Sequence, residues 1–493
     1  MAGGLLQLAG YGNQDNYLTG SPQITYFKAV YRRYTNFSME SISLEFDKSE
    51  LSFDQSQIFK RKLDRNADLV SNIYFTFTLP EIQSPSGRQF YWVKNIGTTI
   101  IKSVAVFIQG RKIDEHYGEW LHIWHELNLG KDQKDNYNQL TGNIPEIYAP
   151  DLADGNNGIY PDSIIDVDFI PSIQSRRIWV PLIFWFNRHP GLALPLIALQ
   201  YHEVELQFVM RPIQDLYTIM ETDPTQPNYG YRVRPQGSIS AHGIQNFLNN
   251  SSLATSNPDG SRSLISFDIN PRMEVNYIFL DTDERKRFAN VSHEYLIERT
   301  FRIEKTGLSG GSTHSLELDL HHPTKELVWS TKRSDTTDHN DYSNFTAWTD
   351  QINPPYSLSY YNPYGITREI TSNNYDNYKN KDILSEAKIL LNGFERFSEN
   401  SETYFGKVQP YQHHFQSPQT GIYCYSFSLD NSNDKSYQPQ GTCNMSMYNN
   451  VNLWVKTNPI DSSESYTYTV TIYAIHYNIL RIISGMGDVE FAP

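Results

Sequence analysis

The stretch QPYQHHFQSPQTGIYCYSFSLDNSNDKSYQPQGTCNMSMYNNVNL, from Gln409 to Leu453, holds two strand-like segments around a turn rich in Pro and Gly. In the first segment bulky apolar residues alternate with small ones: Tyr423, Cys424, Tyr425, Ser426, Phe427, Ser428 and Leu429. Such a period of two residues is typical of a β-strand with one buried and one more polar face. A longer strand-like segment, YTYTVTIYAIHYNILRII, follows from Tyr466 to Ile483.

The same period recurs along the whole chain. It governs the segments 73–79, 203–208, 316–320 and 469–474. A regular alternation of strands with helices, which is typical of parallel sheets, is missing from the sequence. Half-buried strands of this kind predict an all-β fold of antiparallel sandwiches.

Helical patterns are few and short. In the segment 118–129, Trp120, Ile123, Trp124 and Leu127 follow the spacing of one helix face. In the segment 281–290, Asp281 is followed three residues later by Glu284, which resembles a capping box. We expect one short helix at each place.

Composition limits the possible functions. The 493 residues carry a formal net charge of −14, whereas a protein that binds the genome directly is normally basic. Two cysteines, Cys424 and Cys443, exclude a disulfide scaffold and a four-cysteine zinc site. The sequence leaves open whether these two cysteines pair. It contains no stretch of about 18 uninterrupted apolar residues, so we expect no membrane-spanning segment.

The residues that carry chemistry give no catalytic pattern. His122 and His125 stand at helical spacing beside Glu126, but the order His-x-x-His-Glu matches no zinc-protease motif. The pairs at 321–322 and 413–414 are adjacent, so on a strand they point to opposite faces. No nucleophile elbow, phosphate loop or dinucleotide fingerprint is present. We therefore predict no catalytic, cofactor-binding or metal-binding residues, no cofactor, and a protein that is not an enzyme.

Seven blocks of sequence, in order and with matching spacing, together resemble one family. The first is YGNQDNYLTGSPQITYFKAVYRRYTNF, from Tyr11 to Phe37. The others cover residues 96–127, 181–208, 277–298, 318–330, 387–414 and the C-terminal segments 409–453 and 466–487. The chain resembles the double jelly-roll major capsid proteins of the nucleocytoplasmic large DNA viruses.

The resemblance implies two consecutive eight-stranded jelly rolls with a few short helices and long loop insertions. A composition shift after Met210, where prolines interrupt the alternation, suggests a linker. We expect an N-terminal arm at 1–23, a first jelly roll at 24–212, a linker at 213–237, a second jelly roll at 238–487 and a tail at 488–493. Long polar segments at 131–172 and 330–382 are predicted surface loops, the second facing outward.

The resemblance also implies a function. We expect a structural protein of the virion that forms homotrimeric, pseudo-hexameric capsomers, which tile an icosahedral shell assembled in the host cytoplasm. Its partners would be itself, neighbouring capsomers, and minor capsid and penton proteins, with an inner membrane nearby but no insertion and no direct nucleic-acid contact. In the arm, Tyr11, Gln14, Asp15 and Tyr17 are the candidate contacts to a minor capsid protein.

Two further hypotheses stay open at this point. A jelly-roll virion protein that binds carbohydrate or a receptor would show a shallow aromatic site. A jelly-roll oxygenase or isomerase would need bound metal, which the missing His-x-His motif disfavours. Among the Asn-x-Ser/Thr sequons, Asn344 in the second long insertion is the candidate glycosylation site.

Overall fold

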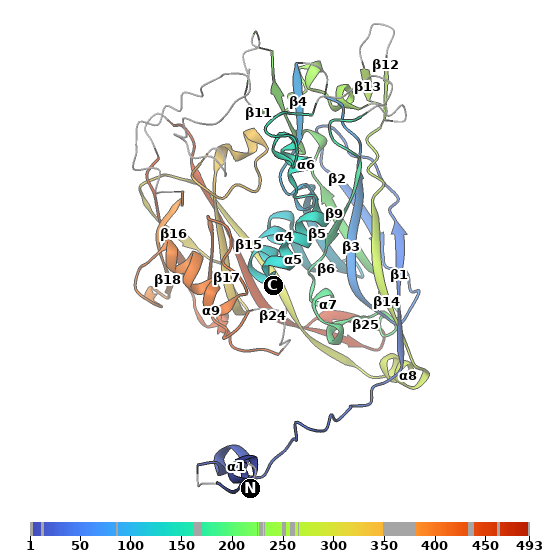
Figure 1. The fold of residues 1–493 in the computed structure, drawn as a ribbon, viewed down its shortest axis with the longest axis vertical. Helices are drawn as coiled ribbons and strands as arrows, with labels where there is room; N and C mark the ends of the chain where they lie inside the picture. The colour runs from blue at the N-terminus through green and yellow to red at the C-terminus, as the bar shows by residue number, and fades with distance from the viewer. Residues whose placement is uncertain are drawn as a thin grey trace. The chain divides into compact units, whose positions relative to one another are not determined.

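The computed structural model describes residues 3–10, 14–84, 87–161, 170–223, 225, 230, 232–248, 253–256, 262–264, 266–348, 381–431, 438–460 and 464–491. The chain divides into two compact units, Met1–Phe37 and Ser38–Pro493 (Figure 1). The first unit contains the helices α1 (Gly3–Ala9) and α2 (Asn16–Thr19). Its α2 is fixed locally, because the hydroxyl of Thr19 donates to the backbone carbonyl of Asp15 at 2.8 Å.

The second unit begins with a sandwich of two sheets, each with four main strands. One sheet has the order β1 (Phe37–Glu45), β14 (Arg272–Leu280), β3 (Leu69–Leu79) and β7 (Arg176–Pro181). The other has the order β2 (Gln57–Lys62), β9 (Val204–Met210), β5 (Ile101–Ile108) and β6 (Arg111–Tyr117). The ladders of β3 with β14 and β7, and of β9 with β2 and β5, are antiparallel.

A second sandwich follows with the same plan. One sheet has the order β15 (His293–Leu308), β24 (Tyr468–Ile483), β17 (Pro323–Arg333) and β21 (Ile422–Ser426). The other has the order β16 (Thr313–Glu317), β23 (Val451–Thr457), β18 (Leu384–Leu391) and β19 (Phe394–Glu395). Ranked along the chain, the main strands of each sandwich run first-eighth-third-sixth and second-seventh-fourth-fifth. This is the double Greek-key order of a jelly roll, so the predicted double jelly roll is confirmed.

Smaller elements decorate the two rolls. A three-stranded sheet and a hairpin belong to the loops of the first roll: β4 (Arg88–Trp92), β10 (Tyr217–Glu221), β11 (Arg232–Val233), β12 (Ala254–Ser256) and β13 (Arg262–Leu264). Short strands extend the main sheets: β8 (Leu194–Pro195), β20 (Asn400–Ser401), β22 (Cys443–Asn444) and β25 (Met486–Val489). The helices are α3 (Ile96–Thr99), α4 (Gly118–Asn128), α5 (Lys131–Thr141), α6 (Pro145–Tyr148), α7 (Trp185–Arg188), α8 (Thr282–Asn290) and α9 (Gln409–His413).

Several segments differ from their predicted roles. The segment 213–237, expected to link the rolls, contains β10 and β11, and β10 pairs with β4 along five residues. The strand β14, expected in the second roll, pairs with β3 of the first. The segment after Gly130, expected to be loop, begins with the helix α5. Pairing with distant strands decides the positions of β10, β11 and β14, which prolines or local composition do not reveal.

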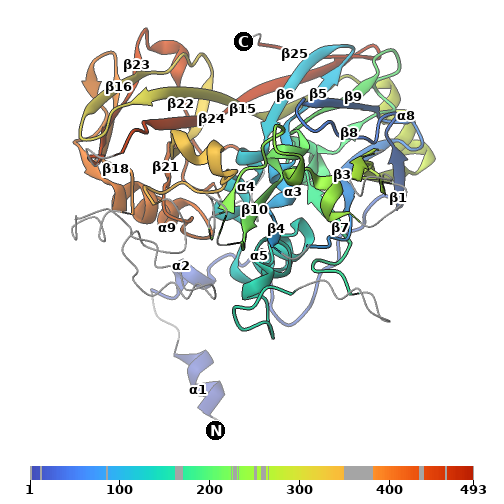
Figure 2. The same cartoon turned by 90° about the horizontal axis from the view of Figure 1, so that it is seen from above.

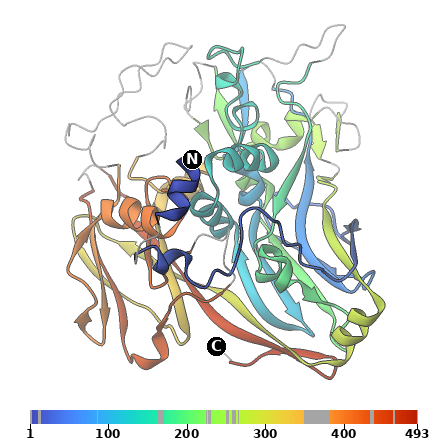
Figure 3. The ribbon, with the colours of Figure 1, turned by 60° about the horizontal axis from the view of Figure 1, so that its bottom comes forward.

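Both predicted helices are present, as α4 and α8. Asp281 is the N-cap of α8, since its side chain accepts a hydrogen bond from the Thr282 amide at 2.7 Å. Figures 2 and 3 show α4 and α5 near the line where the two rolls meet. Within the described segments, no helix is both long enough and apolar enough to traverse a lipid bilayer.

The hydrophobic core runs from one roll into the other. The largest core cluster combines first-roll side chains such as Phe75 and Phe208 with second-roll side chains on β15, β17 and β24. The second-roll members on these strands are Ile297, Val328, Tyr473, Ile475, Leu480 and Ile482. Because apolar burial is the main stabilising term, this shared core joins the rolls into one body.

Candidate functional site: the junction of the two jelly rolls

Aromatic packing forms the centre of the junction. The helix α4 leaves β6 of the first roll and places Trp120 against Tyr473 of β24, with ring centroids 4.9 Å apart. Both side chains are fully buried. A stacked pair of this kind stabilises the fold by about 1 kcal/mol beyond the contribution of its buried apolar area. Through this pair, α4 forms an apolar contact between the two rolls.

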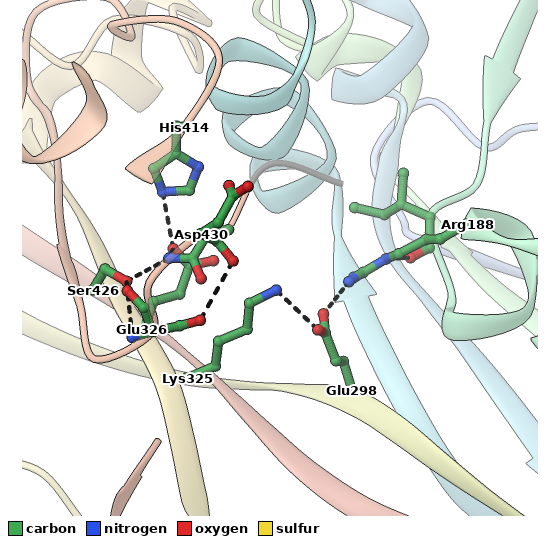
Figure 4. Close-up of polar contacts among 10 residues, drawn as sticks. Arg188, Glu298, Lys325, Glu326, His414, Ser426 and Asp430 are labelled. Carbon is green, nitrogen blue, oxygen red and sulfur yellow. Dashed lines mark hydrogen bonds and ion pairs between the residues drawn. The ribbon is translucent and has the colours of Figure 1, made fainter. Parts of the chain in front are cut away.

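A mostly buried carboxylate, with 19% of its side chain exposed, bridges three elements beside this aromatic pair. Glu298 on β15 accepts hydrogen bonds from Lys325 Nζ of β17, at 2.9 Å, and from the guanidinium of Arg188 on α7. Figure 4 shows Lys325 and Arg188 approaching the Glu298 carboxylate from two sides. Burial alone would raise the pKa of Glu298, but the two cations overcome it and lower the pKa to about 2.

A second carboxylate, on α4, forms a similar bridge to β17 of the second roll. Glu119 on α4 accepts hydrogen bonds from Ser330 Oγ at 2.5 Å and from Lys332 Nζ at 3.1 Å, both on β17. Burial raises the pKa of Glu119, yet Lys332 and Ser330 bring it below its usual value. The lysine also donates to the Tyr342 carbonyl at 2.7 Å, which ties the following loop to the same point.

A third contact covers the open edge of β15. Asp114 on β6 accepts the backbone amide of Thr300 at 3.1 Å, and His116 Nε2 lies 3.0 Å from its other oxygen. Asp114 and His116 are almost completely buried. Since an uncovered edge strand invites pairing with another chain, this carboxylate both joins the rolls and occupies part of an edge.

The neighbouring polar cluster contains the residue types of a hydrolase triad without its geometry. His414 Nε2 lies 3.0 Å from Glu326 Oε2, and Asn431 Nδ2 donates to the same oxygen at 2.8 Å (Figure 4). The Ser426 hydroxyl donates instead to the Ser428 carbonyl at 2.7 Å. A nucleophile needs its hydroxyl hydrogen-bonded to the base, so this cluster stabilises a turn and has no arrangement for acyl transfer.

The histidines of α4 are held apart from one another. His122 faces the second roll, where its Nε2 is 3.2 Å from Gln419 Nε2, while His125 stacks on Tyr137 of α5. Burial lowers the pKa of His122 to about 4 and that of His125 to about 3. Within the described ranges, no three His, Cys, Asp or Glu side chains come together as a metal site.

The predicted arm residues lie in the first unit. Gln14 and Asp15 are exposed, and Asp15 begins the turn that leads into α2. Tyr17 belongs to α2, and the description does not extend to its side chain. Tyr11 lies outside the described residues. Their contact with a minor capsid protein stays a prediction.

Asn344, the candidate glycosylation site, is buried. Only 1% of it is exposed; its Nδ2 donates to the Trp348 carbonyl at 2.9 Å, and its Oδ1 accepts from Thr346. An amide that is hydrogen-bonded in the interior is inaccessible to a glycosyltransferase in this conformation. The rest of this insertion, 349–380, lies outside the described residues, and its outward orientation stays a prediction.

The pairing of β17 with β21 and β22 shows whether Cys424 and Cys443 can form a disulfide. On β17, Thr324 faces Cys443 and Val328 faces Cys424. Because Thr324 and Val328 are four residues apart on β17, the Cα atoms of Cys443 and Cys424 opposite them lie about 13 Å apart. A disulfide needs Cα atoms within about 7 Å. The two thiols are therefore separate in this fold, as free cysteines.

The bridging residues at the junction were not found by sequence reasoning. Arg188, Glu119, Glu298 and Lys325 each interrupt or flank an apolar segment, which is a weak signal because most such charges are solvated. Only the pairing of β15, β17 and α4 reveals that these charges are buried and matched.

Comparison with known proteins gives the family. A model of the major capsid protein N-terminus matches residues 25–281, and a model of the large eukaryotic DNA virus major capsid protein matches residues 284–488. The major capsid protein of Phaeocystis pouchetii virus is 34% identical over 568 residues, covering 100% of both chains. The chain belongs to the major capsid protein family of large eukaryotic DNA viruses.

Other members of the family agree in sequence and in fold. The major capsid protein of Paramecium bursaria Chlorella virus 1 is 35% identical over 520 residues, again with 100% of both chains covered. The crystal structure of PBCV-1 VP54, fitted into a reconstruction of the virophage Sputnik, matches with a TM-score of 0.67 at 29% identity. It covers 95% of this chain and 100% of VP54. The Faustovirus major capsid protein matches at 12% identity with a TM-score of 0.63, covers 97% of this chain and 96% of its own, and shares the fold.

The family and the fold expected from the sequence are thus confirmed. The chain is a major capsid protein, a structural component of the capsid shell of a large DNA virus. The two family models meet between residues 281 and 284, at the start of α8.

Proposed function

We propose that this major capsid protein forms homotrimeric capsomers with a pseudo-hexagonal outline, which tile an icosahedral capsid. The observation that carries the proposal is the identical strand order of the two rolls, joined by a shared core and buried ion pairs. Three copies related by a threefold axis would present six similar sandwiches around a ring. A rigid junction keeps both rolls of one subunit in a fixed relation, as a tile requires.

The experiment that tests the trimer is a light-scattering mass after gel filtration of the purified chain. Three chains of 57.0 kDa predict about 171 kDa. We expect this mass to persist on dilution, because obligate interfaces commonly bury more than about 2,000 Å². A stable, folded 57.0 kDa chain would overturn the capsomer proposal.

We further propose that the N-terminal arm carries contacts to minor capsid proteins, through Tyr11, Gln14, Asp15 and Tyr17. The arm belongs to the separate compact unit Met1–Phe37. Its own exposed apolar side chains include Leu5, Leu6, Leu8 and Leu18. Deleting residues 1–23 should leave the trimer intact and impair shell assembly. Loss of the trimer in this variant would contradict the assigned role.

The remaining parts of the proposal concern where the capsomers assemble and what they contact. Capsomers would meet neighbouring capsomers and penton proteins in a shell assembled in the host cytoplasm, close to an internal membrane but not inserted in it. The protein would act without catalysis and without touching the genome, in keeping with its net charge of −14. We also propose α8 as the boundary between the two rolls, supported by the strand order and the ranges of the two family models.

A further inference from the structure

Three nitrogen-bearing side chains converge beside the junction, outside the bridges described above. Arg299 on β15 stands directly opposite His476 on β24, and directly opposite residues carry their side chains on the same face of a sheet. His322, just before β17, stacks on His476 with ring centroids 4.7 Å apart and planes inclined by 16°. One guanidinium and two imidazoles from three segments therefore share one small region.

Several of their nitrogens lack hydrogen-bond partners. His476 is 6% exposed. Within the described part of the chain, Nε2 of His476, Nε2 of His322, and Nε and Nη1 of Arg299 are buried and make no hydrogen bond. A guanidinium offers five N–H donors and accepts nothing, so the region has a surplus of donors. Buried donors are normally paired, and a group of unpaired donors in one place calls for an acceptor.

One carboxylate, that of Asp114, acts electrostatically on both Arg299 and His476. Its Oδ1 accepts the Thr300 amide, whereas its Oδ2, 3.0 Å from His116 Nε2, makes no hydrogen bond within the described part of the chain. The Ala474 backbone also forms a hydrogen bond with the His476 side chain. The charged groups that act on the imidazoles besides Asp114 are Arg299 on both, His322 on His476 and His321 on His322. Burial first, and then these neighbours, lower the pKa of His476 to about 4. Asp114 thus supplies one negative charge to the region, and the other charged groups around the two imidazoles are basic.

We propose that Arg299, His322 and His476 form a binding site for a small oxyanion of the sulfate or phosphate type. The planar guanidinium presents paired donors that match two oxygens of such an anion. When protonated, the stacked imidazoles of His322 and His476 add two more donors. A bound anion also favours the protonated imidazoles, so affinity rises as the pH falls.

Inorganic sulfate is the suitable probe, because its charge is constant over the pH range in which histidine titrates. Equilibrium dialysis of the purified full-length protein with radiolabelled sulfate, at about pH 5.5 and about pH 8, measures the binding directly. We expect saturable binding with one sulfate per chain and higher affinity at the lower pH. Absence of saturable binding at both pH values overturns the proposal.

Two variants and one control assign the site. Arg299→Gln and His476→Gln should each weaken sulfate binding by about tenfold or more, as expected for loss of a charge-assisted hydrogen bond. Arg481→Gln removes an exposed arginine from the same strand as His476 and should bind like the parent. Gel filtration and circular dichroism check folding, and His476→Gln decides the case if Arg299→Gln does not fold. Parent-like binding by the folded variants shows an adventitious site and overturns the assignment.

Discussion

Glu298 illustrates how a single buried charge can be both costly and necessary. It has two cationic partners, Arg188 and Lys325, from two other elements. Removing the negative charge while keeping the shape, as in Glu298→Gln, leaves two buried cations facing each other. Loss of one partner of a buried ion group typically costs about 3–5 kcal/mol. We expect a decrease of this size in the free energy of unfolding, measured by urea denaturation.

The matched control for this variant lies on the same strand. Glu294 is exposed and pairs with Arg481 at 2.9 Å, so Glu294→Gln should cost no more than about 1 kcal/mol. Equal effects of the two substitutions would mean that the Glu298 bridge is no stronger than a surface pair. Ionised Glu298 also contributes to the free energy of unfolding. This contribution is fully present above the ordinary pKa of 4.5 and is lost as the pH falls toward the folded pKa of about 2.

The burial of His122 leads to a separate prediction about the free energy of unfolding at acidic pH. Its folded pKa, lowered to about 4 mainly by burial, lies below the ordinary value of 6.5. Between these values the unfolded chain binds the proton and the folded chain does not, so stability decreases as the pH falls from about 6.5 to about 4. His122→Gln should flatten the pH dependence of the unfolding free energy in this window. An unchanged slope would show that His122 does not cause it.

At the scale of elements, the first residue of α4, Gly118, packs closely against other backbone because it has no side chain. A Cβ on Gly118 would lie 2.1 Å from the Thr98 carbonyl oxygen and 2.2 Å from that of Ile101. Gly118→Ala must therefore displace α4 from α3 and from the start of β5. We expect a loss of about 3 kcal/mol in unfolding free energy, with disorder of α4 detectable as faster hydrogen exchange.

Gly130 provides the comparison for this element. It lies between α4 and α5 with a φ of −66°, and a Cβ there would meet nothing within 4 Å. Gly130→Ala should change the unfolding free energy by less than about 1 kcal/mol. If the two alanine variants were equally stable, the close approach of α4 to α3 would not limit the packing of the junction.

At the scale of the whole molecule, the shared core predicts cooperative unfolding. The side chains of β24 belong to two clusters: Val470 and Ile472 pack in the second roll, while Tyr473 and Ile475 pack toward the first. Exposing one roll therefore uncovers apolar surface of the other. We expect one calorimetric transition for the body, with equal calorimetric and van't Hoff enthalpies. Two separate transitions, one for each roll, would contradict this.

The sequence by itself determined the fold class, the strands with clear alternation, the two helices and the family. These follow from local period and from motifs in order, which need no knowledge of distant neighbours. The strand β9 is an example, because Val204, Leu206, Phe208 and Met210 make one of its faces continuously apolar.

Only the tertiary structure decided which strands pair in each sheet and how the two rolls are joined. The segment 217–221 is a strand because it pairs with residues 88–92, and the strand 272–280 completes the first sheet because it pairs with β3. Likewise, Glu298 is a buried bridge because Arg188, 110 residues away, donates to it. Local propensity carries no record of such pairings, since their energy arises only when distant segments meet and exclude water.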